Sequence, residues 1–217
     1  MILAAGRGER MRPLTNVTPK PLLKVGGKPL LQYHIENLAQ TGIEYIVINH
    51  VHLGKLIEDY FGNGKKFGVS IHYSAEGDTP LETGGGIKLA LPILRSESFI
   101  VVNADIWTDY DFNKLPRKLD GLAHLVLVAN PPHHLEGDLC LSGDRIKNKT
   151  ENYLTYSGIG VYKAELFSDC KQVTFPLTSI LRPAIAKQRV SGEFYSGRWV
   201  DVGTPERLSL LNKELTR

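Results

Sequence analysis

Hydrophobic positions recur with two different spacings along the first half of the chain. Short apolar runs, three continuous and one alternating with polar residues, predict strands over 1–4, 44–50, 69–73 and 98–103. Between them, apolar residues at helical spacing predict helices between Pro29 and Gly42, over 53–61 and over 86–94. Strands and helices that alternate in this order favour a mainly parallel sheet with helices on both faces.

After Asp111 the pattern changes, because strands follow one another with fewer helices between them. Apolar runs predict strands over 123–129, 153–162 and 198–202, and the turn Ser142-Gly143-Asp144 predicts a hairpin between 139–141 and 145–146. Helical spacing predicts helices over 178–188 and 205–215. No stretch has the composition of a linker, so we predict a single α/β domain over residues 1–217.

Composition and charge argue against several classes of protein. The 217 residues are 42% hydrophobic and 23% charged, as in ordinary soluble globular proteins. A net charge of +3 is too small to predict nucleic-acid or membrane partners, and no apolar run is long enough to cross a bilayer. Cys140 and Cys170 form no metal-binding motif, so we expect a reduced, cytoplasmic setting. We expect a monomer or a weak homodimer.

The strongest chemical signal lies in residues 1–21. The first predicted strand is followed by Gly-Arg-Gly-Glu-Arg at 6–10. Glycines let a backbone approach a ligand closely, and exposed N–H groups with arginines can bind triphosphate oxygens. Lys20 lies between Pro19 and Pro21, which restrict the backbone that holds its ammonium. The stretch is neither a Walker A loop nor a dinucleotide fingerprint, and an ordinary turn is the alternative.

A second glycine stretch lies at residues 80–87, at the start of the predicted helix 86–94. Three consecutive glycines before a helix can leave backbone groups open to a flat ligand, or can form a tight turn between a strand and a helix. Farther along, His133 and His134 are adjacent but lack the spacing of a zinc site.

Two aspartates stand at the ends of predicted strands. Asp105 follows the strand 98–103, and Asp201 lies near the end of the strand 198–202. Ligands of open α/β sheets bind at the carboxyl ends of strands, and Mg²⁺ commonly takes one or two carboxylates together with phosphate oxygens. Each aspartate alone fits a turn or a helix cap equally well. Together with Lys20, the pair favours a magnesium site.

These segments together resemble the sugar-1-phosphate nucleotidylyltransferases, enzymes that join a nucleoside triphosphate to a sugar phosphate and release pyrophosphate. Residues 1–15 match the nucleotide loop of the family and 18–22 match its lysine segment, and the resemblance extends over essentially the whole chain. Family members usually have a few residues before the first strand, which here begins at Met1. The family implies a Rossmann-like mixed, mainly parallel sheet flanked by helices, with a small inserted β subdomain on the sugar side.

The resemblance also implies a role for individual residues. Residues 1–111 would form the nucleotide-binding half, and 112–217 the sugar-binding half with the second metal carboxylate. Asp105 and Asp201 match the two Mg²⁺ ligands, and Lys20 and Arg10 match the catalytic cations, with Arg7 and Arg12 secondary. Contacts with the nucleotide are implied at Leu3, Ala5, Gly6, Gly8, Glu9, Arg10, Lys20, Glu82, Gly85 and Asn103, and with the sugar at Gly137, Asp138 and Gly158.

Within the family, four segments most resemble the N-acetylmuramate-1-phosphate uridylyltransferases of bacterial cell-wall recycling: 49–50, 80–86, 107–112 and 130–134. This resemblance implies UTP and N-acetylmuramate 1-phosphate as partners, and Glu82 would accept the N–H of uracil. The Glu-Lys-Pro that often precedes the sugar-side strand is replaced by Lys149-Thr150-Glu151, which suggests an unusual sugar. The alternatives are a mannose- or glucose-1-phosphate nucleotidylyltransferase that uses GTP or dTTP, and a non-catalytic nucleotide-sugar sensor.

Overall fold

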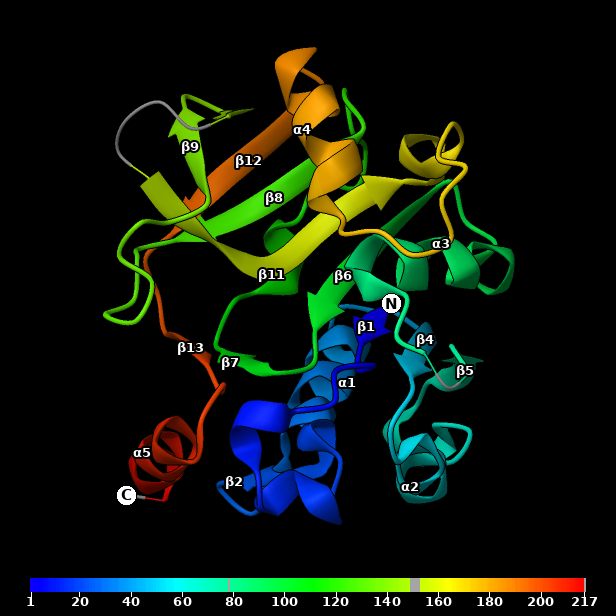
Figure 1. The fold of residues 1–217 in the computed structure, drawn as a ribbon, viewed down its shortest axis with the longest axis vertical. Helices are drawn as coiled ribbons and strands as arrows, with labels where there is room; N and C mark the ends of the chain where they lie inside the picture. The colour runs from blue at the N-terminus through cyan, green and yellow to red at the C-terminus, as the bar shows by residue number, and fades with distance from the viewer. Residues whose placement is uncertain (78, 149–152, 217) are drawn as a thin grey trace.

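A nine-stranded mixed sheet forms the centre of the computed structural model, which describes residues 1–77, 79–148 and 153–216 (Figure 1). The strand order is β5-β4-β1-β6-β11-β8-β12-β10-β9. Its strands are β1 (Ile2–Leu3), β4 (Tyr45–His50), β5 (Ser70–Ala75), β6 (Ser98–Asn103), β8 (Ala123–Val128), β9 (Leu139–Ser142), β10 (Arg145–Lys147), β11 (Tyr153–Lys163) and β12 (Val190–Tyr195).

The N-terminal half of the sheet is parallel. β1 pairs with β4 and β6, with Ile2 opposite both Ile48 and Val102, and β4 pairs with β5. Parallel neighbours need crossover connections. Helices α1 (Leu30–Gln40), α2 (Gly54–Phe61) and α3 (Glu82–Leu94) supply them. The predicted alternation of strands and helices is confirmed here.

The C-terminal half of the sheet is mostly antiparallel. β11 runs antiparallel between β6 and β8, and β8 pairs in parallel with β12. The sequence pattern did not predict β12, because a glycine and a glutamate interrupt its apolar residues. Gly192 is required there, since a Cβ would lie 2.4 Å from the side chain of Ile146. The predicted hairpin over 139–146 is confirmed as β9 and β10, which lie at the far edge of the same sheet.

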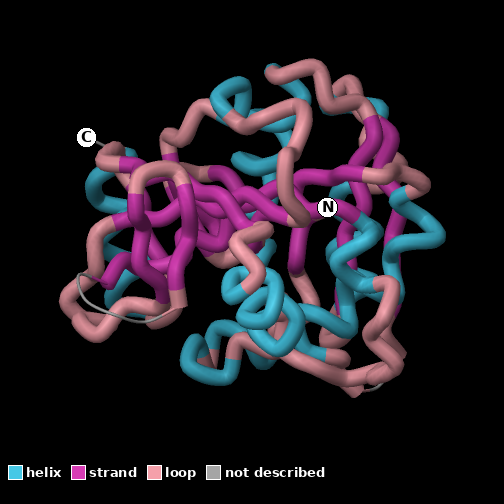
Figure 2. The backbone as a smooth tube through the Cα atoms, turned by 90° about the horizontal axis from the view of Figure 1, so that it is seen from above, coloured by secondary structure: helices cyan, strands magenta, loops and turns pink. Residues whose placement is uncertain are grey.

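Helices cover both faces of the sheet, as Figure 2 shows from above. α3 and α4 (Thr178–Ala186) pack on one face and α1 and α2 on the other. Successive residues of β4 point to opposite faces, so Val47 joins the first core and Ile46 and Ile48 join the second. In the described part of the chain, none of the helices combines the length and apolar character that a membrane span requires.

A small two-stranded sheet joins the C-terminal end to the nucleotide half. β7 (Ile106–Thr108) pairs antiparallel with β13 (Trp199–Asp201). The helix that follows, α5 (Pro205–Leu215), packs against the hairpin of β2 (Lys24–Val25) and β3 (Lys28–Pro29). Val25, Trp107 and Leu211 are buried together in this contact. Asp201 is therefore held beside the strand that follows β6, although it lies far away in sequence.

The second glycine stretch does not form an open loop, which corrects one expectation. α3 begins at Glu82, so Gly84, Gly85 and Gly86 lie buried inside its first turns. The N–H groups of Gly84 and Gly85 both donate to the carbonyl of Phe175, at 3.0 and 3.2 Å. A Cβ on Gly84 would lie 2.4 Å from the Phe175 ring. These glycines are required for close packing, and the two amides are not available to a ligand.

Candidate active site

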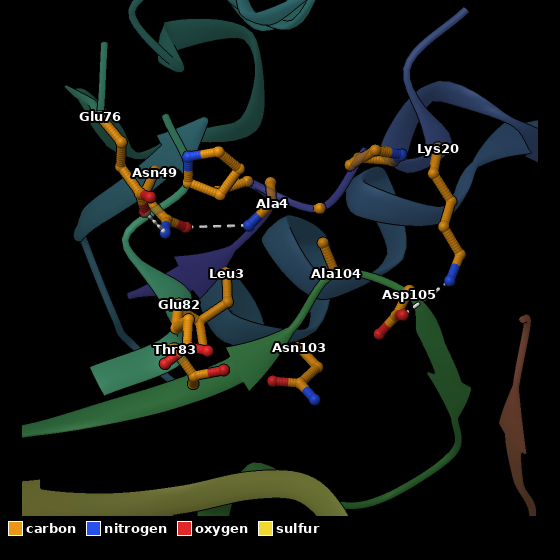
Figure 3. A pocket seen from close by; sticks show the side chains of 14 residues that line it. Leu3, Ala4, Lys20, Asn49, Glu76, Glu82, Thr83, Asn103, Ala104 and Asp105 are labelled. Carbon is orange, nitrogen blue, oxygen red and sulfur yellow. Dashed lines mark hydrogen bonds and ion pairs between the residues drawn. The ribbon is translucent and has the colours of Figure 1, made fainter. Parts of the chain in front are cut away.

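A pocket of about 240 Å³ opens at the carboxyl ends of β1, β4 and β6 (Figure 3). This is where open α/β sheets bind ligands. Its walls come from the first loop, from the ends of three parallel strands and from the start of α3. The lining residues are Leu3, Ala4, Ala5, Gly6, Lys20, Pro21, Asn49, Glu76, Pro80, Glu82, Thr83, Asn103, Ala104 and Asp105.

A second cavity of about 360 Å³ adjoins the first and shares Gly6, Lys20 and Asp105 with it. Gly8, Glu9 and Arg10 line this cavity, as does Gly203 from the C-terminal end of the chain. The two cavities together could hold a nucleoside in the first and its phosphates in the second. Leu3, Ala5, Gly6, Gly8, Glu9, Arg10, Lys20, Glu82 and Asn103 all line one or both, as the predicted nucleotide contacts require.

The first loop is folded tightly onto Lys20. Gly8 has a left-handed backbone conformation, with φ 62°, which favours glycine. A Cβ at Gly8 would lie 2.9 Å from a methyl carbon of Thr15 and 3.2 Å from Cβ of Lys20. The Thr15 hydroxyl donates to the Gly8 carbonyl at 2.8 Å. A residue with a side chain at position 8 would therefore move the loop away from the lysine.

Lys20 and Asp105 form a close ion pair where the two cavities meet. Lys20 Nζ donates to Asp105 Oδ2 at 2.6 Å. The lysine side chain is only 9% exposed, whereas the aspartate side chain is 41% exposed and faces the pocket. Lys20 begins a short 3₁₀ turn after the extended Pro19, so its backbone is fixed as the flanking prolines predicted. An anion entering the pocket meets both the ammonium and the carboxylate.

Buried His34 supports the strand that follows Asp105, and the sequence analysis did not assign it a role. Burial lowers the pKa of His34 to about 4, so the ring is neutral. Its Nε2–H donates to the carbonyl of Ile106 at 2.9 Å. Its Nδ1 has no hydrogen-bond partner within the described residues. A histidine on the apolar face of a predicted helix gives no sign of such a contact, because Ile106 is distant in sequence.

Asp201 lies on the strand next to Asp105. Asp201 is opposite Ile106 in the β13–β7 pair, and the N–H of Val202 donates to the Asp105 carbonyl at 2.9 Å. Asp201 Oδ2 accepts from Nη1 of Arg207 at 2.8 Å and lies 3.1 Å from Nε2 of His133. Neither neighbour was predicted. The backbone segments that carry Asp105 and Asp201 are therefore adjacent, and a magnesium site shared by the two side chains stays a prediction.

The donor set of this region suits a hard cation that is completed by substrate. Within the described residues, no group of three or more His, Cys, Asp or Glu side chains is arranged to hold a metal by itself. Asp105 and Asp201 supply carboxylate oxygens, and their Oδ1 atoms make no hydrogen bond within the described part of the chain. Mg²⁺ commonly binds through one or two carboxylates, with phosphate oxygens and water as its other ligands.

A hydrogen-bonded network supports the far side of the first pocket. The Ala4 N–H donates to Asn49 Oδ1 at 2.9 Å, and Asn49 Nδ2 donates to Glu76 Oε1 at 2.6 Å (Figure 3). Glu76 Oε2 accepts from the N–H of Leu81 at 2.8 Å. The sequence analysis assigned no site role to Asn49 or Glu76 individually. Their position at the carboxyl ends of β4 and β5 could have indicated a site role, because ligands of open α/β sheets bind at that edge of the sheet.

Gly85 is the exception among the predicted nucleotide contacts. It is buried in α3 and does not line the pocket, and a Cβ there would lie 2.3 Å from the carbonyl oxygen of Val173. Glu82 does line the pocket, at the exposed start of the same helix. The glycine stretch thus positions Glu82 and Thr83 without itself touching the cavity.

None of the three predicted sugar contacts lines either cavity. Gly158, with φ 83°, lies in a bulge of β11, where a Cβ would be 2.7 Å from Nδ2 of Asn103, a residue that lines the first pocket. Gly137 and Asp138 line neither of the two cavities. Asp138 accepts from the N–H of Tyr156 and contacts Nε2 of His134, both at 2.9 Å. The segment Lys149-Thr150-Glu151 lies outside the described residues.

Comparison with known proteins agrees with this geometry. The chain is 49% identical to the N-acetylmuramate alpha-1-phosphate uridylyltransferase of Neisseria meningitidis serogroup B, over 96% of this chain and 94% of that protein. It is 34% identical to the protein of the same name from Caulobacter vibrioides, over 95% and 92%. The inositol-1-phosphate CTP transferase of T. maritima shares the fold, with a TM-score of 0.81 at 18% identity over 100% and 95%.

The family described as "Nucleotidyl transferase" matches residues 1–136, which include the first loop, Lys20 and Asp105. This match covers every residue that lines the two cavities except Gly203. Together with the two relatives, it shows what class of reaction the site performs. The chain belongs to the nucleotidyl transferase family and is a nucleotidyltransferase.

Proposed function

We propose that this enzyme transfers a uridylyl group from UTP to N-acetylmuramate 1-phosphate, giving UDP-N-acetylmuramate and pyrophosphate. Two relatives that match nearly the whole chain, at 49% and 34% identity, have names that specify this reaction. The observation that supports it most directly is the Lys20–Asp105 pair at the junction of the two cavities, with Asp201 on the adjacent strand. Nucleotidyl transfer needs such a concentration of charge where two phosphates meet.

The residues of the chain would act by positioning and by charge. The first pocket would hold the uridine, with Glu82 and Thr83 at one wall and Asn103 at another. Arg10 and the loop N–H groups would bind the β- and γ-phosphates in the second cavity. Lys20 would stabilise the charge that develops on the α-phosphate oxygens, and this electrostatic role needs no proton transfer.

We propose Mg²⁺ as the cofactor, held by Asp105 and Asp201. When bound, it would neutralise phosphate charge and orient the triphosphate for in-line attack. Lys20 and Arg207 already accompany these two carboxylates, each through one oxygen. The opposite oxygens would then be available to the cation. The reaction belongs to cell-wall recycling and would take place in the cytoplasm, a setting with which the free thiols of Cys140 and Cys170 are consistent.

A screen of substrate pairs tests this proposal. The purified enzyme is assayed for pyrophosphate release with UTP, dTTP or GTP, each combined with N-acetylmuramate, glucose or mannose 1-phosphate. We expect the highest kcat/KM for UTP with N-acetylmuramate 1-phosphate, and no release without Mg²⁺. Higher turnover of a mannose or glucose pair would contradict the proposed substrate. Binding of nucleotide sugars without turnover of any pair would indicate a sensor.

A further inference from the structure

The proposed reaction brings two phosphates together, and the cations assigned so far face only one of them. Lys20 and Arg10 line the cavity where the triphosphate would lie. In the proposed reaction, the attacking phosphate of the sugar would approach from the side of Asp201 and of the loop between β8 and β9, which contains the predicted sugar contacts Gly137 and Asp138. Repulsion between the two anions opposes this approach unless a further cation is present there.

Arg207 occupies the required place. It lies in the first turn of α5, and its side chain turns back toward β13, so that Nη1 donates to Asp201 Oδ2 at 2.8 Å. A Cβ built on Gly203 would lie only 2.1 Å from Nη2 of Arg207. Gly203 in turn lines the cavity that holds Arg10 and Lys20. The guanidinium therefore lies against a glycine that lines the phosphate cavity.

Some N–H groups of the guanidinium are available to a ligand. Its contacts with Asp201 and with His133 both use Nη1. Within the described residues, Nη2 and Nε have no hydrogen-bond partner, and the side chain is 17% exposed. An arginine presents its N–H groups in a planar arrangement that matches two oxygens of a phosphate. Arg207 can thus bind an oxyanion without releasing Asp201.

His133 places this cluster on the sugar side. It belongs to the loop between β8 and β9, and it reaches across to contact both Arg207 and Asp201. The same loop contains Asp138, which is attached to β11 through Tyr156. A sugar bound between this loop and β11 would therefore direct its anomeric phosphate toward Arg207.

We propose that Arg207 binds the phosphate of the acceptor sugar 1-phosphate and orients it for attack. This inference rests on the proposed function, and it deepens it by naming the group that recognises the second substrate. The short segment from Asp201 to Arg207 would then perform two tasks: its first residue would hold the metal, and its last residue would bind the acceptor phosphate.

Kinetics of R207A and R207K test the assignment, with UTP and N-acetylmuramate 1-phosphate varied separately. Losing hydrogen bonds from a charged group should raise the KM for the sugar phosphate about 10- to 100-fold in R207A, and less in R207K. The KM for UTP and the Mg²⁺ concentration for half-maximal rate should stay within about twofold. R198A is the matched control, because Arg198 pairs with Glu214 at 2.9 Å and lies over Trp107. It should behave as wild type.

G203A gives an independent check in which the arginine at position 207 is not replaced. Its Cβ would lie 2.1 Å from Nη2 of Arg207 and 3.1 Å from Asp201 Oδ1, so it should displace the guanidinium and raise the KM for the sugar phosphate more than the KM for UTP. In R207A, equal increases in both KM values, or a higher Mg²⁺ requirement, would show that Arg207 only holds Asp201 and would overturn the proposal. Binding of unphosphorylated N-acetylmuramate, followed by ligand NMR, should be unaffected in R207A. If it weakens as much as binding of the phosphate ester, the group recognised is the carboxylate.

The outcomes separate this inference from the proposed function. If wild type turns over a different substrate pair, the proposed function fails, and Arg207 is tested with that pair by the same comparison of KM values. If wild type uses UTP and N-acetylmuramate 1-phosphate but R207A has an unchanged KM for the sugar phosphate, only the inference about Arg207 fails. Thermal unfolding of each variant shows whether it is folded, and R207K retains the charge if R207A is not.

Discussion

Lys20 holds its ammonium in a mostly buried position against one carboxylate, and this arrangement has two consequences. The pair with Asp105 compensates the cost of burying a charge while the site is empty. The same ammonium then stands at the junction of the two cavities, ready for phosphate oxygens. Because removal of either partner leaves the other unpaired, substitutions here affect stability as well as turnover, and both must be measured.

The lowered pKa of buried His34 predicts how the stability of the protein depends on pH. Its pKa of about 4 in the folded protein is below the ordinary value of 6.5, so the unfolded state binds more protons between these values. The contribution of neutral His34 to the free energy of unfolding is fully present above pH 6.5, and it decreases as the pH falls toward 4. Between pH 7 and pH 5 the loss should be about 2 kcal/mol.

Urea unfolding of wild type and H34Q at these two pH values measures the effect. Glutamine keeps an N–H near the Ile106 carbonyl but does not titrate, so H34Q should lose about 2 kcal/mol less than wild type on acidification. H52Q, at an exposed histidine, is the matched control. The same pH dependence in H34Q and in wild type would show that His34 is not the group responsible.

At the scale of elements, the three glycines at the start of α3 are required for packing and not for contact with a ligand. Glycine is unfavourable inside a helix, by about 1 kcal/mol relative to alanine. The three glycines are nevertheless needed because the segment 173–175 lies against the helix, with the Phe175 ring and carbonyl on Gly84. Phe175 is distant in sequence, so the glycine pattern alone could not distinguish packing from ligand contact.

G84A tests this interpretation. An exposed helical glycine would gain stability on replacement by alanine, whereas the Cβ here would collide with Phe175 and should cost about 1–3 kcal/mol. The double variant G84A/F175L should recover part of the loss, since leucine lacks the ring atoms. If instead G84A were as stable as wild type and raised only the KM for UTP, the glycines would contact the nucleotide after all.

At the scale of the whole molecule, the sequence predicted every strand of the parallel half of the large sheet and all but β12 of the antiparallel half. A continuous run of β-branched apolar residues, such as that of β4, predicts a buried parallel strand when it alternates with predicted helices. Short strands such as β7 have too few residues for a periodicity, and β12 is interrupted by a glycine. These strands are specified by their neighbours in the sheet rather than by their own residues.

Some parts of the site were predictable from the sequence and others were not. Lys20, Asp105 and the loop at 6–10 follow directly from local motifs, because the chemistry and the backbone come from one stretch of chain. The position of Asp201 depends on the β7–β13 pair and on the packing of α5 against β2, which are long-range. The contacts of Asp201 with His133 and Arg207 cross three segments, and no local pattern indicates them.

The central claim is that Asp105 and Asp201, from distant parts of the chain, serve one transfer centre. Pyrophosphate release by D105N, D201N and the double variant tests it most directly, with folding checked by circular dichroism. We predict that each single variant loses about 10³-fold in kcat and that the double variant loses about as much as either one, because residues that act as a unit are not additive. Losses that multiply in the double variant, or nearly full activity in either single variant, would contradict it.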